Sequence, residues 1–201
     1  MKKTIIYFWL IISSIFCVYT KEYLLFSGKT NKYNDLLKGF TDAEYAIKYD
    51  DEDDILYFQV PDWLDTAWIH LTWNDLSKFR KNIDKYFEWE KLAVKNKAEL
   101  EKELPDSTIK TTVTWNRGDN WYKDKNFELS FRFFSQNPTY HQLVLYTSKA
   151  TGSNRFVTYK IDGFYFDKSQ LQQLLDATNE TVLKAQIEKL KKEKEKEDLF
   201  N

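Results

Sequence analysis

The residues that could do chemistry in this sequence are few and scattered. His70 and His141 are its two histidines, and neither stands in the H-E-x-x-H or H-x-H spacing that brings two imidazoles to one metal ion. Cys17 is the single cysteine. No G-x-S-x-G, P-loop or G-x-G-x-x-G pattern occurs. We therefore predict a protein without catalysis, a bound metal or a cofactor.

Carboxylates are abundant but give no pair that stands out. Five of them are adjacent in Asp50–Asp54, and Ca²⁺ prefers oxygen ligands. The run lacks the glycine and the alternating spacing of a calcium loop, so we interpret it as a solvated hairpin tip. Any two of the 31 acidic residues could still face each other as in a glycoside hydrolase, so a carboxylate-based hydrolase stays an alternative.

Aromatic residues near turns are the candidates for binding. Trp63 follows Pro61, and Trp121 and Tyr122 lie in the polar connection Asn116–Asn126. Flat rings beside polar residues suit stacking on a sugar face or a peptide side chain. We predict ligand binding at Trp121, Tyr122 and Trp63, with an unknown glycan or protein as the partner. The alternative is that these rings cover the ends of the sheet as part of the core.

The first twenty residues predict export. Lys2 and Lys3 precede the apolar run Thr4–Val18, which is short for a membrane-spanning helix and typical of a signal peptide. We place residues 1–20 in this segment, with an uncleaved anchor or a lipoprotein signal at Cys17 as alternatives. The expected location is extracytoplasmic, periplasmic or secreted. Cleavage after Thr20 would leave a chain without cysteine and with a formal charge of −3.

Strands should dominate the body of the chain. Phe127–Phe133 alternates apolar and polar residues, which is the period of a strand with one buried face. The stretch Ile109–Phe166 repeats such segments between short turns, which predicts an antiparallel meander. The expected fold class is α+β. Further strands are predicted at Glu22–Ser27, Ala43–Tyr49, Ile55–Val60, Ala67–Trp73, Ile109–Trp115, Gln142–Thr147 and Arg155–Ile161.

Two amphipathic helices are predicted, the second of them C-terminal. The first begins after Thr72, a residue that favours helix N-caps, and ends at Leu104 before Pro105. The second begins after Asp167 and runs to Leu190. Residues 191–201 form a charged tail, expected to be a solvated helix end. Weak self-association through it is an alternative, because one or two heptads are too few to pair stably.

Residues 21–190 are expected to form one domain. When the sequence is aligned with itself so that Thr72 matches Asp167, the starts of the two predicted helices coincide. Residues 21–104 and 105–190 could therefore be a weak repeat of strands followed by a helix. This layout resembles that of PUR-repeat and Whirly-type proteins, which implies single-strand nucleic-acid binding as an alternative function. The export signal and the negative mature charge oppose that alternative. Membrane contact is expected only through an uncleaved N-terminal segment.

Overall fold

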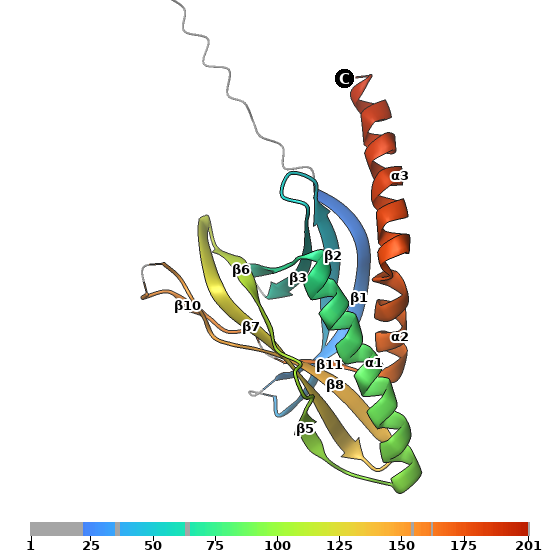
Figure 1. The fold of residues 1–201 in the computed structure, drawn as a ribbon. Coiled ribbons are helices and arrows are strands. Elements are labelled where there is room, and N and C mark those ends of the chain that lie inside the picture. The colour runs from blue at the N-terminus through green and yellow to red at the C-terminus, as the bar shows by residue number, and fades with distance from the viewer. Residues whose placement is uncertain (1–21, 35–36, 63–64, 154, 162, 201) are drawn as a thin grey trace, which may run out of the picture.

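The computed structural model describes residues 22–34, 37–62, 65–153, 155–161 and 163–200 (Figure 1). The predicted signal segment therefore lies outside the described residues. The elements, in chain order, are β1 (Glu22–Asn34), β2 (Gly39–Asp50), β3 (Ile55–Asp62), β4 (Asp65–Leu71), α1 (Trp73–Asn96), β5 (Glu101–Glu103), β6 (Ile109–Arg117), β7 (Asn120–Asn137), β8 (Tyr140–Thr147), β9 (Ala150–Thr151), β10 (Thr158–Tyr159), β11 (Phe164–Phe166), α2 (Lys168–Ala177) and α3 (Glu180–Asp198).

The main sheet is antiparallel throughout its described pairings. Its order is β5-β7-β6-β4-β3-β2-β1-β11-β8, and β7 also pairs with β8. That second pairing closes eight strands into a ring, and β5 adds to β7 outside it. Strands β9 and β10 form a separate short hairpin. The predicted α+β class with a mostly antiparallel meander is confirmed.

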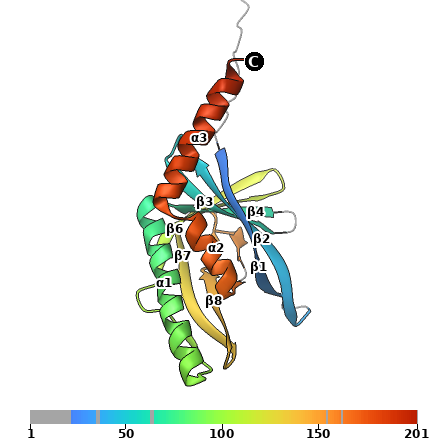
Figure 2. The same ribbon diagram turned by 90° about the vertical axis from the view of Figure 1, so that its right-hand side faces the viewer.

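One face of the sheet, called the inner face here, holds the core. The alternation predicted for Phe127–Phe133 is confirmed, because its four apolar side chains are all buried and its three polar ones are not. Phe79 of α1 lies between two strands, 6.1 Å from the Phe58 ring and 5.2 Å from the Phe131 ring. Figures 1 and 2 show the three described helices on this one side of the sheet. The described helices leave the opposite, outer face of β3, β4, β6 and β7 uncovered (Figures 1 and 2).

Helix α1 starts as predicted and ends earlier. Thr72 accepts from the backbone N–H of Asp75, whose carboxylate accepts from the backbone N–H of Thr72, so each side chain satisfies one donor. The predicted end at Leu104 is wrong. The helix stops at Asn96 because Lys97 takes a left-handed conformation, with φ of 51°. The chain beyond it becomes the edge strand β5.

The second predicted helix is divided into α2 and α3. Asp167 and Gln170 form the expected capping box at its start. At the break, Thr178 donates its hydroxyl to the carbonyl of Leu174 at 2.6 Å, and Asn179 caps α3 with its side-chain oxygen. Because these polar side chains satisfy the backbone groups at both helix ends, the chain can turn here at low cost.

Helix α3 is held to the start of α1 and to the sheet by lysines that lie over aromatic rings. Lys184 lies 5.1 Å from the ring of Trp73 in α1, and Lys191 lies 5.3 Å from the ring of Tyr49 in β2. Lys191 also pairs with Asp51 at 2.5 Å. The helix therefore continues through the predicted charged tail to Asp198 and extends beyond the sheet (Figures 1 and 2). In the described part of the chain, no helix has both the length and the apolar character to span a membrane.

Candidate binding face on the outer side of the sheet

Trp121 and Tyr122 lie in a strand and not in a loop. The predicted connection Asn116–Asn126 is wrong, because β6 and β7 continue through it and only Gly118 and Asp119 turn between them. Neighbouring side chains of a strand point to opposite faces, so the two rings do not share a surface. Trp121 is 64% exposed on the outer face. Tyr122 packs on the inner face against Trp115, with 5.5 Å between the rings.

The exposed ring of Trp121 rests on a second indole. Trp68 in β4 lies 4.9 Å from it, measured between ring centroids. The indole N–H of Trp68 is buried and has no hydrogen-bond partner among the described residues. A buried donor without a partner costs about 1–3 kcal/mol, so this pair of tilted rings is kept at an energetic cost. Trp63, the third predicted contact, lies outside the described residues.

Next to the tryptophans, the outer face carries a hydrogen-bonded polar cluster. His70 Nε2 lies 3.2 Å from Thr114 Oγ1, and its ring meets the Tyr57 ring edge-on at 4.9 Å. Tyr57 donates its hydroxyl to Asp50 at 3.0 Å. Burial, with a smaller contribution from Lys123, lowers the pKa of His70 to about 4. The imidazole is therefore neutral at pH 7 and acts as a hydrogen-bonding group, not as a cation.

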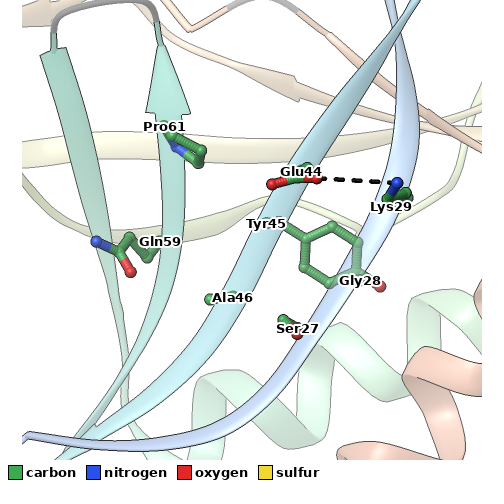
Figure 3. Close-up of a pocket in the computed structure, with 8 residues that line it drawn as sticks. All are labelled: Ser27, Gly28, Lys29, Glu44, Tyr45, Ala46, Gln59 and Pro61. Atoms are coloured by element: carbon green, nitrogen blue, oxygen red, sulfur yellow. Dashed lines mark ion pairs between the residues drawn. The ribbon is translucent and has the colours of Figure 1, made fainter.

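A groove of about 310 Å³ lies on the outer face at β1, β2 and β3 (Figure 3). Small side chains make its floor, because Ser27 and Ala46 leave space above the strands. Gln59 and Pro61 of β3 line one side, as Figure 3 shows. The groove therefore combines a hydroxyl, an amide, an apolar ring and the exposed ion pair of Lys29 and Glu44 within one concave site (Figure 3).

The floor of the groove depends on a glycine. The Tyr45 ring points from β2 across to Gly28 of β1, in the manner that Figure 3 shows. A Cβ at Gly28 would lie 2.5 Å from the Tyr45 hydroxyl oxygen, a distance that real Cβ atoms do not adopt. Glycine at this position lets the Tyr45 ring lie directly against the β1 backbone.

The groove and the tryptophan pair belong to one surface. Register places Ala46 opposite Gln59, Gln59 opposite Trp68, and Trp68 opposite Thr114. Because residues opposite each other in neighbouring strands share a face, the four side chains form a row that leads from the groove to the tryptophans. We call the surface formed by this row, the groove and Trp121 the outer binding face.

The other residues that the sequence offered as candidate site residues, the acidic run and the second histidine, make contacts within the protein. Four residues of the acidic run, Asp51–Asp54, form the turn between β2 and β3, as expected. The prediction is wrong for Asp50, which is buried at the end of β2 and accepts hydrogen bonds from the Tyr57 hydroxyl and the Glu52 backbone. No cluster of three or more metal-ligating side chains occurs among the described residues. His141, the second histidine, lies just after the turn between β7 and β8. It is buried in β8, where its Nδ1 lies 2.9 Å from Ser135 Oγ.

Sequence reasoning missed Trp68, Gln59 and the groove. A signal for Trp68 was present, because the alternation of Ala67–Trp73 puts it on the same face as His70. The groove had no such signal, since its residues come from three strands whose register is not visible in the sequence. Comparison with protein-family models, with curated proteins and with solved structures found no match.

Proposed function

We propose that this chain is an exported, non-catalytic binding protein of the cell envelope or secreted space, which holds a glycan or protein partner on the outer binding face. The observation that carries the proposal is the contact between the indole rings of Trp121 and Trp68, which lie 4.9 Å apart with their planes tilted by 37°. Trp121 is 64% exposed on a sheet face that the described helices leave open. Much of its apolar surface therefore stays in contact with water, although folding normally buries such surface. A bound partner would recover that burial.

The support beneath Trp121 makes it suited to binding. An aromatic ring that already lies against a second ring loses little freedom when a ligand covers its other face. Tyr122 contributes from the inner side, where its contact with Trp115 anchors the same strand. Trp63 stays a proposed contact, because it follows β3, whose residues Gln59 and Pro61 line the groove.

Export is the second half of the proposal and is supported by residues 1–20 alone. Lys2, Lys3 and the apolar run after them predict a signal peptide or an uncleaved anchor. Fractionation of cells that express the full-length protein, combined with intact mass, tests this half. An extracytoplasmic protein that lacks the first segment supports it, and an uncleaved cytoplasmic protein contradicts it.

The binding half is tested by replacing Trp121 with alanine. The wild-type protein and Trp121→Ala are compared on a glycan array and against an envelope-protein fraction. Loss of a buried aromatic contact should weaken binding by at least about tenfold. Leu199→Ala is the control, because Leu199 is 81% exposed at the C-terminal cap of α3 and belongs to no strand of the outer binding face. Equal binding by Trp121→Ala and the wild type would refute the site.

A further inference from the structure

We propose that a second copy of this chain docks the C-terminal end of its helix α3 into a groove between α1 and β5, so that copies associate head to tail. This contact goes beyond the proposed function, because neither surface belongs to the outer binding face. Three features support it: an open apolar groove, a pair of exposed apolar side chains, and the charges around each.

A second groove, of about 260 Å³, lies where helix α1 ends. After the left-handed Lys97 the chain turns back towards β5, and the Ser135 backbone N–H holds it to β7 by donating to the Leu100 carbonyl at 2.9 Å. We call the space between the helix and this returning chain the α1–β5 groove. Six of the eight described residues that line it are apolar: Trp89, Leu92, Ala93, Ala98, Leu100 and Phe133. Lys102 is the single charged residue of the eight.

The α1–β5 groove suits apolar side chains of a protein. Leu92, which lines it, is 58% exposed, so water contacts apolar surface there. The floor is well supported, because the Trp89 ring packs against the buried Phe133 ring with 6.0 Å between their centroids. The volume is below the roughly 300–1,000 Å³ of pockets that enclose small ligands. One or two apolar side chains would therefore fill the groove.

Two such side chains follow one another at the end of α3. Leu199 is 81% exposed and Phe200 is 90% exposed, so the fold buries neither. The helix carries them beyond the sheet, to the opposite end of the molecule from the end of α1 in both views (Figures 1 and 2). The end of α3 therefore cannot enter the α1–β5 groove of its own copy, whereas it can enter that of another copy.

The charges around the two surfaces are complementary. Around the α1–β5 groove, three lysines stand against one carboxylate in the sequence: Lys95, Lys97 and Lys102 against Glu99. In the last turn of α3, three carboxylates stand against one lysine: Glu195, Glu197 and Asp198 against Lys196. The acidic helix end would therefore be attracted to the groove while its apolar side chains fill it.

Other carboxylates near the groove do not cancel its positive charge. Glu101 and Glu103 point to the opposite face of β5 from Lys102, because neighbouring residues of a strand alternate in direction. Glu101 also pairs with Arg132 at 2.6 Å. Glu90 in α1 pairs with a lysine of α2 at 3.0 Å.

Charge also selects the end of α3 over another exposed apolar residue. Phe156 is 92% exposed in the connection between β9 and β10. It directly follows Arg155, so docking of Phe156 would bring a second cation towards Lys102 in the groove. Like charges brought together in an interface oppose binding, whereas the end of α3 brings carboxylates.

The contact joins two different surfaces, so it is heterologous. Each copy keeps a free groove at one end and a free helix end at the other when it binds a neighbour. Such a contact forms rings where the rotation between copies closes, and open chains where it does not. The expected assembly is therefore not limited to a dimer.

The test measures the mass of the purified protein, in the form that cells produce, by sedimentation equilibrium between about 10 µM and about 1 mM. Phe200→Ser removes the ring from the helix end, and Leu92→Asp places a carboxylate in the groove, where it would repel the acidic helix end. Lys102→Glu is a second groove variant. Phe156→Ala and Trp121→Ala are the controls, because each removes an exposed ring elsewhere. Urea-unfolding midpoints equal to that of the wild type establish that each variant is folded.

The expected result is a wild-type mass that rises above that of a dimer as the concentration increases, and less so in 500 mM NaCl. Phe200→Ser, Leu92→Asp and Lys102→Glu should each weaken association by at least about tenfold, and the two controls should not. An equal mixture of Phe200→Ser and Leu92→Asp should form a dimer and stop there, because only one intact groove and one intact helix end can meet.

Three results would overturn the proposal. One is a wild-type protein that stays monomeric at the highest concentration. Another is association that Phe200→Ser or Leu92→Asp leaves unchanged; loss with Phe200→Ser alone would point to pairing between two helix ends. The third is a mixture of these two variants that does not associate. None of these results bears on Trp121, so the proposed function and this contact fail independently.

Discussion

Gly28→Ala should destabilise the fold through one buried ring. The added Cβ would lie 2.5 Å from the hydroxyl oxygen of Tyr45 and 2.6 Å from the ring carbon that bears it. Ordinary carbon contacts begin near 3.5 Å, so the ring would have to move by roughly 1 Å. It has little room, because the ring stacks on Phe58 at 5.1 Å and meets Phe166 at 5.4 Å. Overpacking of this kind costs about 1–3 kcal/mol.

The assay is urea unfolding followed by far-ultraviolet circular dichroism. Gly39→Ala is the matched control, because Gly39 also lies in a strand of the same hairpin and a Cβ there meets nothing closer than 3.8 Å. It should be neutral or slightly stabilising, since alanine reduces the freedom of the unfolded chain. In the Tyr45→Ala background the clash is gone, so Gly28→Ala should cost much less there than in the wild type.

Two results would refute this reasoning. One is a Gly28→Ala variant with the same free energy of unfolding as Gly39→Ala. The other is an undiminished cost of Gly28→Ala when Tyr45 is alanine, since the loss would then come from backbone effects and not from the ring. Either result would also remove the argument that the floor of the groove depends on this glycine.

Two more predictions concern titration and charge. The pKa of His70 is lowered to about 4 in the fold against 6.5 in the unfolded chain, so its contribution to stability is complete above pH 6.5 and is lost as the pH falls towards 4. Because the ring is partly open to solvent, the free energy of unfolding should fall by only about 1–2 kcal/mol through His70 as the pH is lowered from 7 to 4.5. In the His70→Gln variant, urea midpoints measured over the same pH range should not show this part of the fall. Lys191→Ala removes the contacts with Asp51 and Tyr49 and should cost about 1 kcal/mol, less in 1 M NaCl. Lys189→Ala, which breaks only an exposed pair within α3, should cost less; equal losses would contradict the docking role of Lys191.

Local features were predictable because the interactions that make them span a few residues. The capping boxes at Thr72 and Asp167 depend on a residue three positions along the chain, and both are present. The buried alternation of Phe127–Phe133 follows from the strand period alone. The turn Asp51–Asp54 follows from the solvation of adjacent charges.

Other features were misread where local composition and tertiary packing disagree. The polar residues of Asn116–Asn126 suggest a loop, yet they pair as strands because the inner face there is buried by Trp115 and Tyr122. The helix predicted to reach Leu104 ends early because β7 offers hydrogen bonds to the chain that follows Lys97. In both places, partners distant in sequence outweigh the local pattern.

The sequence alone determined the α+β class, the antiparallel character and the starts of both predicted helices. These follow from side-chain periodicity and from contacts within one turn of helix or strand. Only the tertiary structure decided that Trp121 lies on Trp68, that Tyr122 faces the core, and that three strands form a groove around Gly28. The reason is register: a shift of one residue between paired strands would exchange their faces, and long-range packing of the whole closed sheet selects one register.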